Sequence, residues 1–351
     1  MPKPSKGFRA HFSGAFITRR DAVHARKAVF LSRRPHRSFR LTHPRDARRS
    51  LKLPGYIAFT HEVNQTLRRY WKQFALLGVV YGLLTIALIG VGSQETYATL
   101  LSTLQETSQG ALSGDVGQSG QASILFLSIA TAGLTGELSE SQQIYASLVA
   151  LLVWLTTIWL LRQRLAGRVV RLRDGLYNAG SPIVATFLVT LVLVVQLLPL
   201  AIALIGYGAA TATGLLAGGV EAMLFWAAFV LLLALSLYWV TATFFALIVV
   251  TLPGTYPVRA LKIAGDLVVS RRLRIMYRLL WMFLVIAMVW AIILIPVILF
   301  DSWIKSVWPA IESFPLVPGM LLFMGTASIL WAASYVYLLY RKVVEDDALP
   351  A

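Results

Sequence analysis

Apolar residues in this chain form long uninterrupted runs separated by shorter polar connections, which is typical of helices that cross a bilayer. A helix of about 20 apolar residues spans a hydrocarbon core of roughly 30 Å. We therefore expect an all-α, polytopic membrane protein. Its six predicted transmembrane helices are residues 74–91, 144–161, 183–207, 222–250, 279–300 and 316–340.

One further apolar segment, at residues 122–134, is shorter than the roughly 20 residues that a spanning helix needs. We interpret it as an interfacial or re-entrant helix on the outer side. If it crossed the bilayer, every later connection would change sides.

The connections between these runs alternate in charge. Residues 92–143 and 208–221 contain no Lys or Arg, whereas residues 162–173 contain five Arg and residues 251–278 are again basic. Cytoplasmic loops retain Lys and Arg while translocated loops lack them. The alternation predicts a multi-pass protein of the bacterial cytoplasmic membrane with both termini in the cytoplasm.

A basic amphipathic stretch precedes the first, third and fifth predicted spans, near residues 56–72, 164–178 and 259–274. Such helices lie in the headgroup plane, where Lys and Arg reach anionic phosphates. Two interpretations stay open: they anchor and orient the hairpins, or they bind lipid headgroups or a substrate specifically. The predicted headgroup contacts are Arg168, Arg171, Arg173, Arg259, Lys262, Arg271, Arg272 and Arg274.

The composition supports the membrane assignment and separates a basic tail from the helices. Apolar residues make up 57% of the chain and charged residues 14%, with a mean hydropathy of +0.69. The net charge of +16 is confined largely to the tail and alternate connections. It therefore indicates the orientation of the protein in the membrane before it indicates any binding partner. We expect three regions: a disordered cytoplasmic tail at 1–53, a six-helix domain at 54–345 and a short cytoplasmic tail at 346–351.

Residues that could perform catalysis are scarce near the spans. The chain has no Cys and all five His precede residue 62, which excludes thiol nucleophiles, Ser/His hydrolases and His-ligated zinc within the membrane region. No phosphate-binding loop and no mid-membrane acid or base is present. We predict a protein that is not an enzyme, with no metal and no cofactor.

Three other features predict helix geometry. Gly78 and Gly82 have the GxxxG spacing of close helix packing, within this chain or with a second protomer. Pro199 and Pro296 predict a kink or a helix end near the outer ends of the third and fifth spans. Gln196 lies deep in a span, so we expect it to form a hydrogen bond between helices.

The stretch PGTYPVRALKIAGDLVVSRRLRIMYRLL, at residues 253–280, resembles a repeated pattern in the uncharacterised YciC-like membrane proteins. It is also similar to the membrane domain attached to some glycerophosphodiester phosphodiesterases. GRVVRLRDGLYNAGSPIVATFLV, at residues 167–189, is a looser second match. The resemblance implies six membrane helices in two or three hairpin repeats. It implies no chemistry, because the phosphodiesterase activity lies in a separate catalytic domain.

The leading functional hypothesis is a non-catalytic membrane protein whose basic cytoplasmic face contacts anionic lipids, with a role in envelope or lipid homeostasis. A transporter or lipid-moving permease is the first alternative, because of the hairpin repeats and the prolines within spans. A membrane adaptor is the second, because the basic tail could bind RNA, the ribosome or another acidic partner.

Overall fold

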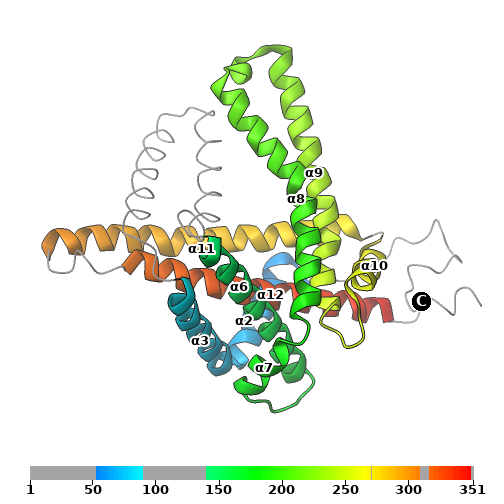
Figure 1. Ribbon diagram of the computed structural model, residues 1–351. Coiled ribbons are helices and arrows are strands. Elements are labelled where there is room, and N and C mark those ends of the chain that lie inside the picture. Colours follow the sequence, from blue (N-terminus) through cyan, green and yellow to red (C-terminus); the bar gives the residue numbers. More distant parts are fainter. Residues whose placement is uncertain (1–52, 90–139, 270, 309–315, 349–351) are drawn as a thin grey trace, which may run out of the picture.

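The computed structural model describes residues 53–89, 140–269, 271–308 and 316–348 (Figure 1). The regular elements in these ranges are all helical. They are α2 (Tyr56–Arg69), α3 (Trp71–Ile89), α6 (Glu140–Leu165), α7 (Leu172–Ala179), α8 (Ile183–Ala212), a 3₁₀ turn η2 (Leu215–Ala217), α9 (Gly219–Val249), α10 (Pro257–Val268), α11 (Arg272–Val307) and α12 (Leu316–Ala348).

Six of these helices are long and apolar enough to cross a membrane, which confirms the predicted fold class. The qualifying stretches are Trp71–Leu88, Ser141–Leu165, Ile183–Ala212, Gly219–Val249, Arg272–Lys305 and Gly319–Asp346. The basic tail at 1–52 and the segment at 122–134 lie outside the described residues. At the other end, α12 continues through Ala348, beyond the predicted domain boundary at residue 345.

The described helices form three units, each with a short helix followed by two long ones. The units are α2, α3 and α6; then α7, α8 and α9; then α10, α11 and α12. The short helices fall where the sequence shows its three basic amphipathic stretches. Among the described helices, the order of one short helix and two long helices therefore occurs three times.

The three units pack on one another in a closed ring. The short helix of each unit contacts the last helix of the unit before it: α7 lies on α6, α10 on α9, and α2 on α12. The first long helix follows the same rule, because α8 contacts α6, α11 contacts α9, and α3 contacts α12. The first unit thus completes the ring by packing on the third.

Local sequence explains how the short helices reach their partners. In α10, Ala260, Ala264, Leu267 and Val268 share one face at helical spacing and are all buried. In α7, Gly175 allows close approach to α6, since an added Cβ would lie 3.1 Å from Leu160 Cδ2. In α2, the buried Phe59 ring meets the edge of Tyr335 on α12 at a centroid distance of 4.8 Å. The apolar faces of these helices are therefore covered by protein.

A side-chain hydrogen bond joins the two long helices within each unit. Tyr81 and Thr156 hydroxyls lie 2.7 Å apart between α3 and α6, and the Thr243 hydroxyl donates to Gln196 Oε1 at 2.6 Å between α9 and α8. In the third unit, Trp290 Nε1 donates to Ser328 Oγ at 2.8 Å. The expected interhelical role of Gln196 is confirmed. Hydrogen bonds of this kind contribute about 0.6 kcal/mol each in membrane proteins.

Both intramembrane prolines lie inside continuous helices, so the alternative of a helix end is wrong at each position. Pro199 is within α8 and Pro296 within α11. Next to Pro199, the Leu200 N–H donates to the buried Ser236 Oγ on α9 at 3.1 Å. A neighbouring helix thus satisfies a backbone group beside the proline, as membrane helices commonly require.

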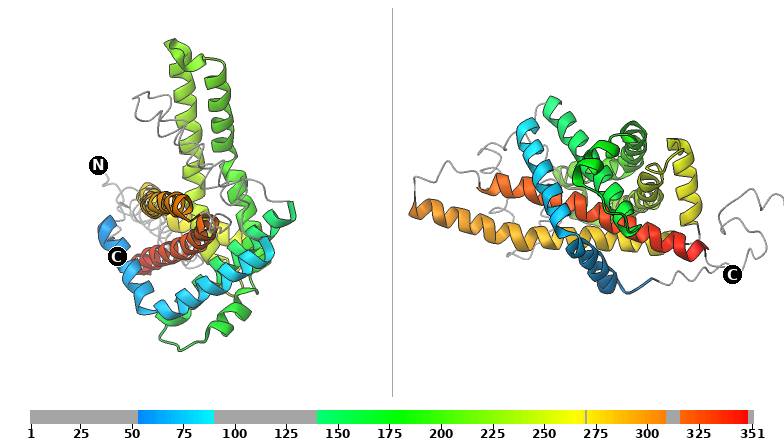
Figure 2. Two further views of the ribbon diagram at one scale, coloured as in Figure 1. Left: turned by 90° about the vertical axis from the view of Figure 1, so that its left-hand side faces the viewer. Right: turned by 90° about the horizontal axis from the view of Figure 1, so that it is seen from below.

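The main core lies at the ends of the helices that adjoin the basic connections. It joins the second half of α6, the last turns of α9, the start of α11 and the second half of α12. The hairpin of α8 and α9 rises away from this core, while α11 and α12 run side by side across its foot (Figures 1 and 2). The opposite ends of the spans therefore diverge.

Candidate functional site

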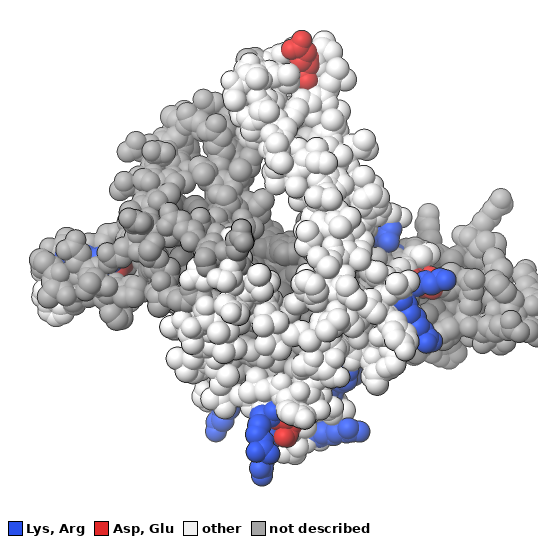
Figure 3. Space-filling view, in the orientation of Figure 1, with Lys and Arg blue, Asp and Glu red and all other residues white. Residues whose placement is uncertain are grey.

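Most Lys and Arg side chains of the described residues lie at the end of the molecule that holds the main core. Figure 3 shows them along the lower and right-hand edges, near α7 and α10, whereas the only charge visible at the tip of the α8–α9 hairpin is acidic. The acidic residue in the first turn of α9 is Glu221. The basic connections, which alternate along the chain with connections that lack Lys and Arg, thus lie together at one end of the folded molecule. We call this region the basic end.

One group of arginines at the basic end turns inward and joins helix ends. Arg162, near the end of α6, donates to the Thr251 carbonyl at 3.0 Å and to the Thr251 hydroxyl at 2.5 Å, just beyond α9. Arg164 donates to Gln73 Oε1 on α3 at 2.6 Å and to the Val170 carbonyl at 3.0 Å. Arg162 thus joins the first unit to the second, and Arg164 joins α6 to α3 within the first unit.

Arg271 also belongs to this inward group, and its placement differs from the expected headgroup contact. It is 2% exposed, and its Nη2 lies 2.8 Å from Asp346 Oδ2 on α12. Its Nη1 donates to the Val343 carbonyl at 3.4 Å. The turn between α10 and α11 directs this side chain toward the end of α12, so the guanidinium joins two helices of the third unit.

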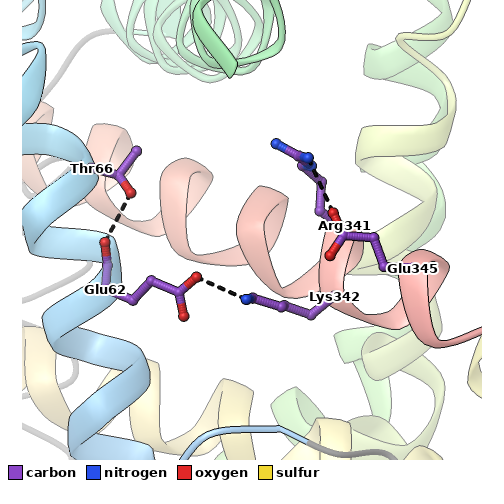
Figure 4. Close-up of polar contacts among 5 residues, drawn as sticks. All are labelled: Glu62, Thr66, Arg341, Lys342 and Glu345. Carbon is purple, nitrogen blue, oxygen red and sulfur yellow. Dashed lines mark hydrogen bonds and ion pairs between the residues drawn. The ribbon is translucent and has the colours of Figure 1, made fainter. Parts of the chain in front are cut away.

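An ion pair joins α2 to α12, and cation–π contacts join α2 to α11. Figure 4 shows Glu62 on α2 paired with Lys342 on α12, at 2.9 Å, beside the Arg341–Glu345 pair within α12. Arg278 on α11 donates to the Pro54 carbonyl and lies over the rings of Tyr56 and Phe59, at 5.0 and 5.4 Å. This polar layer closes the ring between the first and third units.

A second group of basic side chains points outward. Arg168, Arg171, Arg173, Arg259, Lys262 and Arg274 are exposed, and none forms an ion pair with another described residue. Arg272 is half-buried, with its guanidinium 3.8 Å from the centre of the Tyr238 ring. Seven of the eight predicted headgroup residues therefore keep some exposed surface. They lie in two patches, one at α6–α7 and one at α10–α11.

The GxxxG pair does not mediate close packing within the described residues. A Cβ added to Gly78 or Gly82 would meet no other atom within 4 Å. Close packing of this pair, within this chain or with a second protomer, therefore stays a prediction. Gly78 instead lines an apolar groove between α3, α11 and α12.

The acidic residues of the described helices form no arrangement that indicates catalysis. Among the described residues, no group of three or more His, Cys, Asp or Glu is placed to hold a metal ion. At the end opposite the basic end, Asp301 is 1% exposed and lies 2.8 Å from Lys305 one turn later on α11. An i,i+4 pair of this kind neutralises a buried carboxylate.

Sequence reasoning missed the inward arginines and the groove. Arg162 and Arg164 follow an apolar helix just as the exposed Arg168 does, so no signal in the chain separates them. Comparison with known proteins finds no matching family model, no matching curated protein and no matching solved structure.

Proposed function

We propose that this protein is a non-catalytic integral membrane protein of the bacterial cytoplasmic membrane whose basic end contacts anionic lipid headgroups, in support of envelope or lipid homeostasis. Both termini would be cytoplasmic. The observation that carries the proposal is the set of exposed, ion-pair-free basic side chains at one end of six apolar helices.

Physical chemistry favours lipid phosphates as their partner. Basic residues attract an anionic leaflet with about 1 kcal/mol each near the surface. Arg259, Lys262 and Arg274 adjoin long apolar spans, so they would lie at headgroup depth when those spans are in the hydrocarbon core. The inward arginines already have partners within the protein: Arg162 and Arg164 donate hydrogen bonds, and Arg271 pairs with Asp346.

The test replaces the outward group and leaves the inward group intact. A triple variant, Arg259→Gln, Lys262→Gln and Arg274→Gln, is extracted from membranes of mixed phosphatidylglycerol and phosphatidylcholine. We expect severalfold less co-purified phosphatidylglycerol than with the wild-type protein. The matched control, Arg259→Lys and Arg274→Lys, keeps the charge and should retain the wild-type amount. Equal lipid retention in all three proteins would contradict the proposal.

A second candidate, a lipid-moving permease, is favoured by the three-unit ring and by the continuous helices through Pro199 and Pro296. Many transporters are built from internal repeats. Proteoliposomes that contain a fluorescent phospholipid and are treated with an impermeant quencher test it. Quenching beyond that of protein-free vesicles would support transport; equal quenching would leave the binding role as the better proposal.

A further inference from the structure

An apolar groove runs between α3, α11 and α12, close to the end of α2. Its volume is about 630 Å³, within the roughly 300–1,000 Å³ of typical ligand sites. Phe74, Val289, Ile293, Phe323 and Met324 contribute to its walls. Three of the six apolar spans enclose this groove, so it lies at the depth of the lipid acyl chains.

Three neutral polar residues that line the groove, Asn64, Ser328 and Trp331, form side-chain hydrogen bonds. Trp331 Nε1 donates to Asn64 Oδ1 at 2.9 Å near the α2 end, and Trp290 Nε1 donates to Ser328 Oγ at 2.8 Å. Arg68, which also lines the groove, is exposed, and its side chain forms no hydrogen bond or ion pair with any other described residue. Its guanidinium is the charged donor at the groove.

We propose that the groove holds one acyl chain of an anionic phospholipid, whose phosphate binds Arg68. The proposal rests on the membrane location proposed above but assigns a single site, separate from the two exposed patches. The apolar walls match a hydrocarbon chain, and each buried CH₂ group gains free energy as it leaves water. The guanidinium supplies several N–H donors for the phosphate oxygens. A basic residue beside an apolar groove between spans favours a lipid over a helix from another protein, which would bring no complementary phosphate.

Gly78 offers a direct way to fill the groove. Gly78 lines the groove and a Cβ at this position meets nothing within 4 Å, so Gly78→Leu has room to start a side chain into the groove. Gly82→Leu is the matched control, since it makes the same change one turn later in α3, also into open space, and Gly82 does not line the groove. Leu is also the better helix former, so neither change weakens the helix itself. Ala327→Leu fills the groove from α12 if Gly78→Leu fails to fold.

The measurement is native mass spectrometry of protein exchanged into detergent with phosphatidylglycerol and phosphatidylcholine of identical acyl chains. We expect one phosphatidylglycerol per wild-type chain. Gly78→Leu and Ala327→Leu should lower this occupancy roughly tenfold, because loss of a few buried CH₂ groups suffices for that factor. Gly82→Leu should bind like the wild-type protein.

The headgroup is tested separately. Arg68→Gln should weaken phosphatidylglycerol binding about fivefold, the equivalent of the roughly 1 kcal/mol contributed by one basic residue, and should leave phosphatidylcholine binding unchanged. Arg69→Gln removes the same charge from the next residue, which does not line the groove, and should have little effect.

Several outcomes would overturn the site. These are no bound lipid on the wild-type chain, equal binding of the two lipids, or wild-type occupancy in both groove-filling variants. A shift between monomer and dimer in Gly78→Leu, with lipid unchanged, would assign the groove to a second copy. The triple Gln variant of α10 and α11 should keep this one lipid, so failure of the groove and failure of the basic end are distinguishable.

Discussion

The two ends of the spanning helices are built in different ways. At the basic end, Phe245 and Ile248 on α9 are 0% exposed, packed among helices from all three units. Toward the opposite end of the same hairpin, Ile205 is 74% and Leu224 is 67% exposed. Large apolar surface of this kind would be costly in water, whereas in lipid it costs little. The larger of the two buried clusters among the described helices therefore lies at the basic end, and the smaller one joins the far parts of α11 and α12.

The hairpin of α8 and α9 has its own small cluster away from that core. Rings of Tyr207, Phe225, Trp226 and Phe229 lie with centroids 5.6–6.5 Å apart. These contacts involve α8 and α9 alone, so they stabilise the hairpin without joining it to the other units. Removing contacts at the two ends should therefore have unequal effects.

The largest expected difference between the two ends is in their accessibility to a reagent outside the cell. With no native cysteine, Leu215→Cys in η2 and Val258→Cys in α10 report opposite ends of the spans. An impermeant thiol reagent on intact cells should label the first and spare the second, because the basic end is expected in the cytoplasm. The reverse labelling pattern would invert the proposed orientation.

The second expected effect is a change of shape. The spans of α8 and α9 run crosswise to α11 and α12 (Figure 1), whereas helices in bilayers tilt by only about 20° on average. We expect the diverging ends to approach one another when the protein moves from detergent into a bilayer. Spin labels on Leu215→Cys and Val307→Cys would report a shorter distance in bilayers; an unchanged distance would show that the ring is rigid.

Core truncation should have the largest effect on stability. Phe245→Ala at the basic end should lower the free energy of unfolding by about 3–5 kcal/mol, because it leaves a cavity among packed helices. Ile205→Ala on α8, toward the tip of the hairpin, where the side chain is 74% exposed, should cost about 0.5 kcal/mol or less. Equilibrium unfolding in mixed SDS micelles measures both values. Equal costs would remove the distinction between the two ends.

The next largest difference in stability is expected between variants of the inward and the outward arginines. Arg271→Met breaks a buried ion pair and should destabilise the protein by about 2–3 kcal/mol, below the usual range for a fully buried pair because Asp346 keeps some contact with solvent. Arg274→Met, on the exposed side of the same helix, should change stability by less than about 0.5 kcal/mol. Thermal unfolding of the two variants in one detergent compares them directly. A stable Arg271→Met protein would mean that the pair contributes nothing to the ring.

The smallest expected effects test the repeat. Tyr81→Phe, Thr243→Val and Ser328→Ala each remove one interhelical hydrogen bond from a different unit. Each should cost about 0.6 kcal/mol, with an upper limit near 1.7 kcal/mol. The same SDS titration, run on all three, would show whether the bonds are equivalent. A cost confined to one unit would argue that the units have diverged in structural role.

Several features of the fold could be predicted from the chain because they depend on patterns along it. Six apolar runs of sufficient length give six long helices, and the polar Gln196 within an apolar helix finds a hydrogen-bonding partner. The charge alternation becomes a basic end in space. Each of these conclusions needs only helix geometry and the cost of burying a polar group.

Other features depend on which helix faces meet, and the chain contains little information about that. Helices α8, α9 and α11 are apolar on every side, so periodicity cannot choose the face that packs. For this reason the ring closure of α2 on α12, the open surface at Gly78 and the groove beside it appear only in the folded molecule. Arg271 and Arg274 are three residues apart in one basic stretch, yet one is buried against Asp346 and the other is exposed. The sequence sets how many charges lie near the basic end, whereas packing between units sets which of them stay exposed.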